Sequence, residues 1–125
     1  MTAHVGSILV VEDDEMLRET LGEVLADEGH EVRGAAHGYE ALECLDERGV
    51  DLIVLDLMMP RMDAFEFREH QRRRPDAATT RLIVLSAARD IETAAERLEA
   101  DGWLAKPFSL IDVIELVSDL LPERA

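Results

Sequence analysis

Three runs of almost uninterrupted Val, Ile and Leu limit most strongly what this chain can fold into. They are Ile8–Val11, Leu52–Leu55 and Leu82–Leu85. Short runs without polar alternation are typical of parallel strands that are covered on both faces. Segments with helical periodicity separate the runs, and parallel strands need such crossover connections. The sequence therefore predicts an α/β fold.

Five strand candidates alternate with five helix candidates along the chain, which predicts a doubly wound sandwich. The second strand is weaker and more polar than the others and suits an edge of the sheet. The third helix is the least convincing, because Arg68 and Gln71 fall where core residues are expected. The strands are expected at Ser7–Glu12, Glu31–Ala36, Asp51–Asp56, Arg81–Ser86 and Trp103–Lys106. The helices are expected at Glu15–Glu28, Gly38–Arg48, Met62–Arg74 and Asp90–Ala100, and from Ser109 until shortly before Pro122.

Composition narrows the class of protein. The 125 residues suit a single domain, 1–125, with a core of about 6–122. A formal net charge of -15 argues against nucleic-acid binding by this domain. The single cysteine, Cys44, excludes an internal disulfide. No stretch resembles a signal peptide or a membrane span, so a cytoplasmic protein without membrane contact is expected.

Acidic, hydroxyl and basic side chains stand where the strand candidates end. Glu12 and Asp13 follow the first run, Asp56 closes the third strand, Ser86 closes the fourth and Lys106 closes the fifth. In doubly wound folds, ligands bind at the carboxyl ends of the strands near a switch point in strand order. Carboxylates gathered there need a neutralising partner, and a divalent cation is the simplest one. Either Asp13 or its neighbour Asp14 can also cap the helix that follows, and Asp14 is read as a cap or outer-shell acid rather than a ligand.

Four short motifs, in their order and spacing, resemble those of response regulator receiver domains of two-component systems. The resemblance covers essentially the whole chain. It implies a flavodoxin-like sheet of five parallel strands in the order 2-1-3-4-5 with five helices, as in chemotaxis receivers. Each motif alone is weak, but their combination is specific. The motifs are Ile8-Leu9-Val10-Val11-Glu12-Asp13-Asp14, Asp56-Leu57-Met58-Met59-Pro60, Val84-Leu85-Ser86-Ala87 and Lys106-Pro107-Phe108.

The resemblance implies a phosphoacceptor and a metal site. Asp56 would attack phosphorus as a carboxylate nucleophile. Mg²⁺ would be the cofactor, bound by Asp13, Asp56 and the backbone carbonyl of Met58, with Glu12 acting nearby, through water. Pro60 would have a structural role in the loop after the acceptor.

The resemblance also implies a switch. Ser86 and Lys106 would bind the phosphoryl oxygens, and Pro107 would follow a cis peptide bond that orients Lys106. Trp103 stands where the family usually has a Tyr or Phe that rotates inward with Ser86. A packed or half-exposed tryptophan is an equally good reading of Trp103. The domain would catalyse only its own phosphorylation and dephosphorylation, so it is not expected to be an enzyme.

The implied partners are a sensor histidine kinase or a phosphotransfer protein as donor. An output partner of unknown identity would bind the face formed by the helix from Asp90, the last strand and the helix from Ser109. Dimerisation on activation stays open.

Some residues depart from the family pattern and keep an alternative open. Ala64 and Glu99 stand where Gly is common, and the stretch from Ser86 to Lys106 is about two residues shorter than usual. The alternative is a degenerate receiver that acts as a phosphate-independent interaction module. A haloacid-dehalogenase-type phosphatase is disfavoured by Met58, which replaces a second aspartate. A flavin-binding domain would need a Ser/Thr/Gly-rich phosphate loop after the first strand.

Overall fold

The computed structural model describes residues 5–121, and strands and helices alternate throughout this range. Every expected strand and helix is present, and each bound lies within about two residues of its expected position. Pro122, expected after the last helix, lies outside the described residues. The elements are β1 (Ser7–Val11), α1 (Glu15–Asp27), β2 (Glu31–Ala35), α2 (Gly38–Glu47), β3 (Leu52–Asp56), α3 (Ala64–Arg72), a 3₁₀ turn (Ala77–Thr79), β4 (Arg81–Ser86), α4 (Ile91–Leu98), β5 (Gly102–Ala105) and α5 (Leu110–Leu120).

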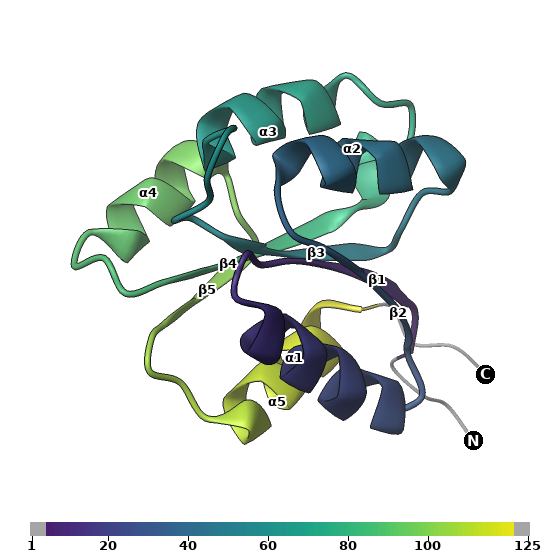
Figure 1. The fold of residues 1–125 in the computed structure, drawn as a ribbon, viewed down its shortest axis with the longest axis vertical. Coiled ribbons are helices and arrows are strands. Elements are labelled where there is room, and N and C mark those ends of the chain that lie inside the picture. Colours follow the sequence, from purple (N-terminus) through teal and green to yellow (C-terminus); the bar gives the residue numbers. More distant parts are fainter. Residues whose placement is uncertain (1–4, 122–125) are drawn as a thin grey trace.

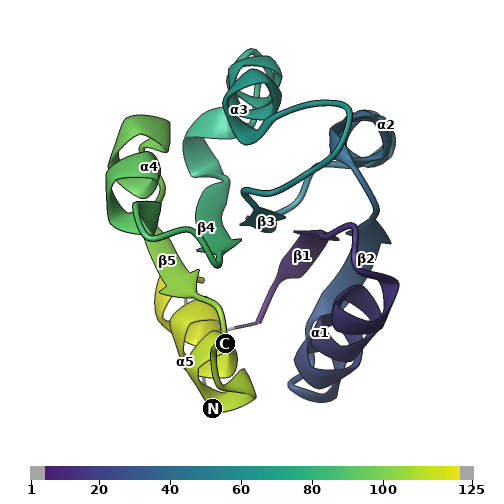
Figure 2. The same cartoon turned by 60° about the vertical axis from the view of Figure 1, so that its left-hand side comes forward.

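The strands form one parallel sheet in the order β2-β1-β3-β4-β5, which confirms the expected fold. Helices α1 and α5 cover one face, and α2, α3 and α4 cover the other (Figures 1 and 2). The order reverses direction between β1 and β3, which is the switch point at which ligands bind in folds of this kind.

The two helix layers explain the uninterrupted apolar runs. Along β1, Leu9 and Val11 pack in the core beneath α2, α3 and α4. Ile8 and Val10 pack against α1 and α5 on the opposite face. Because successive strand residues point to opposite faces, a strand covered on both sides needs an apolar residue at each position. Burying each such side chain contributes about 1.5–3 kcal/mol.

The two edge strands are less buried than the three central strands. Only the last residue of β2, Ala35, is buried, and β2 lies at one edge as expected. β5 lies at the other edge, where half-buried and exposed positions alternate and Trp103 is 40% exposed. In this structure the Trp103 side chain is half-exposed and not packed inward.

Capping decides which of two neighbouring aspartates belongs to the site. The Asp14 side chain accepts a hydrogen bond of 3.1 Å from Leu17 N at the start of α1. Asp13 is therefore not the cap, and its carboxylate faces the end of the sheet. Gly29 follows α1 with a φ of 97°, the left-handed conformation that glycine adopts without strain.

Helix α3 is two residues shorter at each end than expected, and its polar residues have a structural explanation. Gln71 is buried, and its side-chain oxygen accepts a hydrogen bond of 2.8 Å from Arg68. Arg68 also donates to the carbonyl oxygens of Leu98 and Glu99 at 2.9 and 3.0 Å. Arg72 donates to Leu98 O at 3.1 Å. These polar residues supply the donors that the last carbonyls of α4 lack.

Helix α4 is short, in agreement with the shortened stretch between Ser86 and Lys106. It ends at Leu98, and the next residue, Glu99, has a left-handed φ of 55°. Among the described residues other than glycine, only Arg61 and Glu99 have a positive φ. Ala64 is the first residue of α3 and has no positive φ, so an alanine in place of the usual glycine causes no backbone strain here.

Candidate functional site

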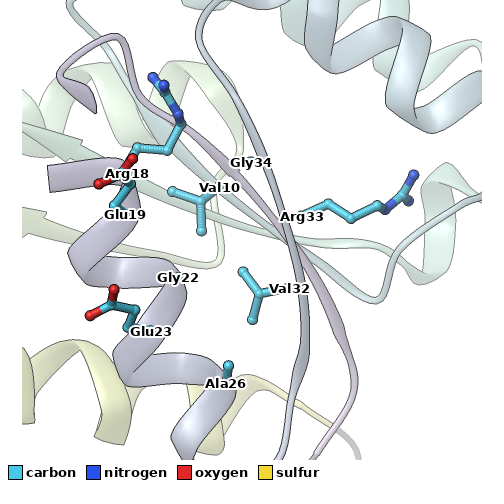
Figure 3. Close-up of a pocket in the computed structure, with 9 residues that line it drawn as sticks. All are labelled: Val10, Arg18, Glu19, Gly22, Glu23, Ala26, Val32, Arg33 and Gly34. Atoms are coloured by element: carbon cyan, nitrogen blue, oxygen red, sulfur yellow. The ribbon is translucent and has the colours of Figure 1, made fainter. Parts of the chain in front are cut away.

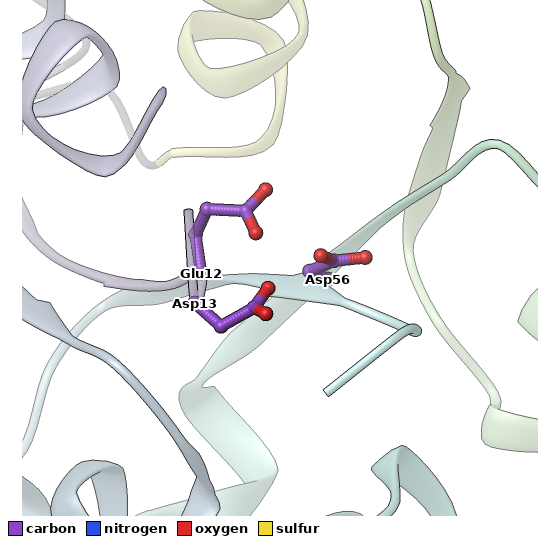
Figure 4. A group of neighbouring side chains, drawn as sticks. All are labelled: Glu12, Asp13 and Asp56. Atoms are coloured by element: carbon purple, nitrogen blue, oxygen red, sulfur yellow. The ribbon is translucent and has the colours of Figure 1, made fainter. Parts of the chain in front are cut away.

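The carboxyl edge of the sheet brings three acids together. Val11 pairs with Leu55 across β1 and β3, so Glu12 and Asp56, the next residues, stand side by side. Both are almost fully buried, with 1% and 2% of their surface exposed, while Asp13 is exposed. One carboxylate oxygen from each of the three residues lies within 4.8 Å of the others. Figure 4 shows the three side chains converging on a common space.

Lys106 brings a positive charge to these acids from the far end of the chain. Its Nζ lies 2.9 Å from Glu12 Oε1 and 3.3 Å from Asp56 Oδ2. Lys106 directly follows β5, and its backbone N–H donates to Ser86 O at 2.8 Å. The bond from Lys106 to Pro107 is cis. Lys106 therefore pairs with Asp56 in this structure.

Backbone amides hold the carboxylates in place. Met58 N donates to Asp56 Oδ1 at 3.0 Å, and Asp14 N donates to Glu12 Oε2 at 3.3 Å. Leu57 N donates to Leu85 O at 2.9 Å, which fixes the start of the loop after β3. The turn that carries the Met58 carbonyl therefore begins at the Asp56 carboxylate itself. The Met58 side chain is exposed.

Ser86 lies at the same edge but is engaged elsewhere. It is fully buried at the end of β4, and its Oγ accepts a hydrogen bond of 3.0 Å from Ala88 N. Because the next residues lead into α4, this hydrogen bond fixes the start of the β4–α4 loop. The structure thus joins Glu12, Asp13, Asp56 and Lys106 in one cluster, with Ser86 beside it on β4.

Burial and crowding perturb the acid–base properties of the cluster. Burial, together with the hydrogen bond to Asp56, raises the pKa of Glu12 to about 7 although Lys106 acts in the opposite direction. Burial alone would lower the pKa of Lys106, but the hydrogen bond that Lys106 donates to Glu12 and the charge of Asp56 outweigh it and raise that pKa. The cluster therefore holds more negative charge than one lysine can balance.

This donor set suits a hard divalent cation. All three side chains offer carboxylate oxygens, and no sulfur or imidazole ligand accompanies them in the cluster. Mg²⁺ binds few protein carboxylates and keeps several waters, which an exposed Asp13 beside two buried acids permits. The residues present therefore fit the expected Mg²⁺ site.

Sequence reasoning missed Arg18. Its Nη1 donates a hydrogen bond of 2.7 Å to the backbone oxygen of Glu12. Arg18 lies outside the apolar stripe of α1, and no spacing rule links a helix arginine to the carbonyl of the preceding strand end. The contact can be recognised only in the structure, where Gly34 of β2 leaves room for the Arg18 side chain.

Two of the described histidines have structural contacts. His30 is buried and its Nδ1 accepts from Gly6 N at 3.2 Å, and His37 caps α2 by accepting from Glu40 N at 3.2 Å. Both therefore have structural roles. Within residues 5–121, every helix is too short or too polar to cross a bilayer.

The comparisons with known proteins agree with this geometry. The model of the response regulator receiver domain family matches residues 8–118. Response regulator RR06 of Streptococcus pneumoniae is 38% identical over 117 residues, which cover 92% of this chain and 52% of RR06. Transcriptional regulatory protein GltR of Pseudomonas aeruginosa is 35% identical, over 97% of this chain and 51% of GltR. The chain thus spans about half the length of the curated relatives it matches.

Solved structures show the same fold. Chemotaxis response regulator CheY4 of Vibrio cholerae superimposes with a TM-score of 0.86 at 29% identity, covering 94% of this chain and 99% of CheY4. NtrX of Brucella abortus superimposes with a TM-score of 0.78 at 30% identity, covering 92% of this chain and 28% of NtrX. With the family match over residues 8–118, the sheet order and the acidic edge, these likenesses show that the chain belongs to the receiver domain family of two-component response regulators.

Proposed function

We propose that this domain is a phosphorylation-dependent signalling switch whose phosphoacceptor is Asp56. The observation that carries the proposal is the position of Asp56, buried at the end of β3 between two further acids and the ammonium group of Lys106. Burying a carboxylate beside two further acids costs free energy, and such costly arrangements are concentrated at functional sites.

Asp13, Asp56 and the Met58 carbonyl would hold Mg²⁺, and Glu12 would act through a water. When bound, the ion supplies charge neutralisation for the transferring phosphoryl group. The same neutralisation allows three carboxylates to remain ionised within 4.8 Å of one another.

The protein groups orient the nucleophile and receive the product. Met58 N and Lys106 Nζ bind different oxygens of Asp56 and so fix the plane of the carboxylate. One of these oxygens forms a bond to phosphorus while the bond from phosphorus to the donor, a phosphohistidine nitrogen or an acyl oxygen, breaks. The electron pair of that bond leaves with the donor. Lys106 then binds an oxygen of the aspartyl phosphate, as charge-assisted pairing favours.

Phosphorylation would change the hydrogen bond of Ser86. In the present state Ser86 Oγ accepts from Ala88 N, and after phosphorylation the Ser86 hydroxyl would donate a hydrogen bond to a phosphoryl oxygen. The loop into α4 shifts as Ser86 moves, and β5 is tied to β4 by the hydrogen bond from Lys106 N to Ser86 O. A face formed by α4, β5 and α5 would report the change to an output partner by population shift. The donor would be a histidine kinase or a phosphotransfer protein.

The proposal is tested by intact mass after incubation with acetyl phosphate and Mg²⁺. One phosphoryl adduct is expected for the wild-type protein. No adduct is expected for Asp56→Asn or when EDTA replaces Mg²⁺. Asp119→Asn, which changes an exposed aspartate of α5, is the matched control and should be labelled like the wild type.

An unlabelled wild-type protein, under conditions that label another receiver, would refute the switch. Absence of both Mg²⁺ and beryllofluoride binding would then favour the phosphate-independent interaction module. An adduct that persists in Asp56→Asn would show that a different residue accepts the phosphoryl group.

A further inference from the structure

Arg18 connects helix α1 to the acidic edge of the sheet. It lines a groove of about 360 Å³ between α1 and β2, where Figure 3 shows its side chain beside the start of the helix. Its Nη1 donates 2.7 Å to the backbone oxygen of Glu12. That oxygen belongs to the peptide group that joins Glu12 to Asp13.

We propose that Arg18 is a positioning residue for the metal site, an inference that rests on the proposed function. A peptide group is planar, so a hydrogen bond to Glu12 O restrains the orientation of the Asp13 N–H as well. Glu12 and Asp13 flank this peptide group, and both of their side chains must face the cation. Arg18 therefore sets the angle between two ligand-bearing side chains without touching the ion.

Other contacts of this turn show why the arginine is needed. Glu12 N donates to Ala35 O at 3.0 Å, which fixes the amide on the β1 side of the residue. Asp14 N is held by the Glu12 carboxylate, and Asp14 O accepts from Arg18 N at 2.9 Å. The peptide between Glu12 and Asp13 is held by Arg18 from the first turn of α1. Removing that donor leaves the peptide with more freedom to rotate.

Gly34 provides the space that the Arg18 side chain occupies. A Cβ at Gly34 would lie 3.2 Å from Arg18 Cδ and 3.3 Å from Arg18 Cγ. Among the described glycines only Gly29 has a positive φ, so the backbone at Gly34 does not require glycine. A larger residue at this position would therefore push the arginine stem away from β2 without removing its charge.

The positive charge of Arg18 and its positioning role predict opposite changes in Mg²⁺ affinity when Arg18 is removed. The direction of the change therefore tests the inference. The guanidinium is a cation close to a cation site, so removing it should strengthen Mg²⁺ binding if only Coulomb repulsion mattered. If Arg18 positions the ligands, removing it should weaken binding. Groups that orient metal ligands typically contribute about 10-fold or more to affinity.

The experiment is calorimetric titration of the protein with Mg²⁺, with unfolding in EDTA measured separately for each variant. Arg18→Met is expected to bind Mg²⁺ about 10-fold more weakly, and Arg18→Lys, which keeps a donor, should recover part of the loss. Arg33→Met is the control. Figure 3 shows the Arg33 side chain directed away from α1, and it binds Cys44 O and Arg48 O at 2.7 and 2.6 Å.

Gly34→Val provides an independent perturbation that retains the positive charge. It should weaken Mg²⁺ binding in the wild-type background and have no further effect when Arg18 is already Met, because both changes remove one contact. Equal or tighter binding by Arg18→Met, or a full additional loss in the double variant, would overturn the inference alone. Failure of the wild-type protein to bind Mg²⁺ would overturn the proposed metal site as well.

Discussion

Replacing Glu12 with Gln is expected to stabilise the metal-free protein. The pKa of Glu12 rises from 4.5 to about 7 because the carboxyl group is buried beside Asp56. A carboxyl whose pKa is higher in the folded state favours folding when protonated, so this contribution is lost as the pH rises from 4.5 to about 7. Above that range, the ionised side chain opposes folding by about 3 kcal/mol, at roughly 1.4 kcal/mol per pH unit.

A neutral glutamine removes this unfavourable contribution to folding at high pH, where Glu12 is ionised. At low pH the contribution is small, so little is gained by removing it. Glu12→Gln should therefore raise the free energy of unfolding by up to about 3 kcal/mol at pH 8 and by about 1 kcal/mol at pH 5. The measurement is urea unfolding in EDTA at both pH values. Glu115→Gln, which changes an exposed glutamate of α5, is the control and should have no such pH-dependent effect. Saturating Mg²⁺ should reduce the advantage of Glu12→Gln, because the ion stabilises the ionised cluster.

A Glu12→Gln protein that is no more stable than the wild type at pH 8 would refute the reasoning. An advantage of the same size at pH 5 and pH 8 would also refute it, because the effect would then not arise from ionisation.

Two further predictions concern stability. Burial lowers the pKa of His30 below its ordinary 6.5, and the ring accepts a hydrogen bond from Gly6 N. The contribution of the buried ring to stability is therefore present above pH 6.5 and is lost as the pH falls through the lowered pKa. His30→Gln, which can accept the same hydrogen bond without titrating, should therefore gain relative to the wild type between pH 8 and pH 5 in urea unfolding. A constant difference would contradict this. Glu99→Gly should be more stable than Glu99→Ala by about 1 kcal/mol, since both lose the ion pair with Arg72 and only glycine adopts a φ of 55° without strain. Equal urea midpoints for the two variants would show that the left-handed residue stores no strain.

The sheet could be predicted from the sequence because burial on both faces requires nearly uninterrupted apolar residues in β1, β3 and β4. Each position in such a strand needs an apolar residue, so the runs show both the element and its central place. The ends of the helices were less certain. Asp13 and Asp14 are equally good caps by residue type, and only the hydrogen bond to Leu17 N distinguishes them.

The site could be predicted in part for a similar reason. Residues that end parallel strands meet at one edge, so Glu12, Asp13, Asp56 and Lys106 were placed together by topology and by their resemblance to a known family. Their roles in phosphoryl transfer and metal binding stay predictions until the experiments above are done. Arg18 could not be found in this way, because its contact depends on how a helix packs over the strand end.

The arginines of α3 could not be interpreted from periodicity either. Arg68 stands at a position that should face the core, and its apolar stem can pack there while its guanidinium reaches α4. Pattern rules treat a side chain as wholly polar or wholly apolar. They therefore misjudge a residue whose two ends meet different surroundings.

The contacts of Arg68 and Arg72 make α4 a helix that is fastened at one end. Its last carbonyls are bound to α3, whereas at its start the Asp90 side chain makes no capping hydrogen bond. Eight residues of helix measure about 12 Å at 1.5 Å per residue, so a swing of roughly 10° about the fastened end would move the other end by about 2 Å. The uncapped end is the one that follows Ser86. A small displacement beside the acidic edge would therefore tilt α4 as a lever whose pivot lies on α3.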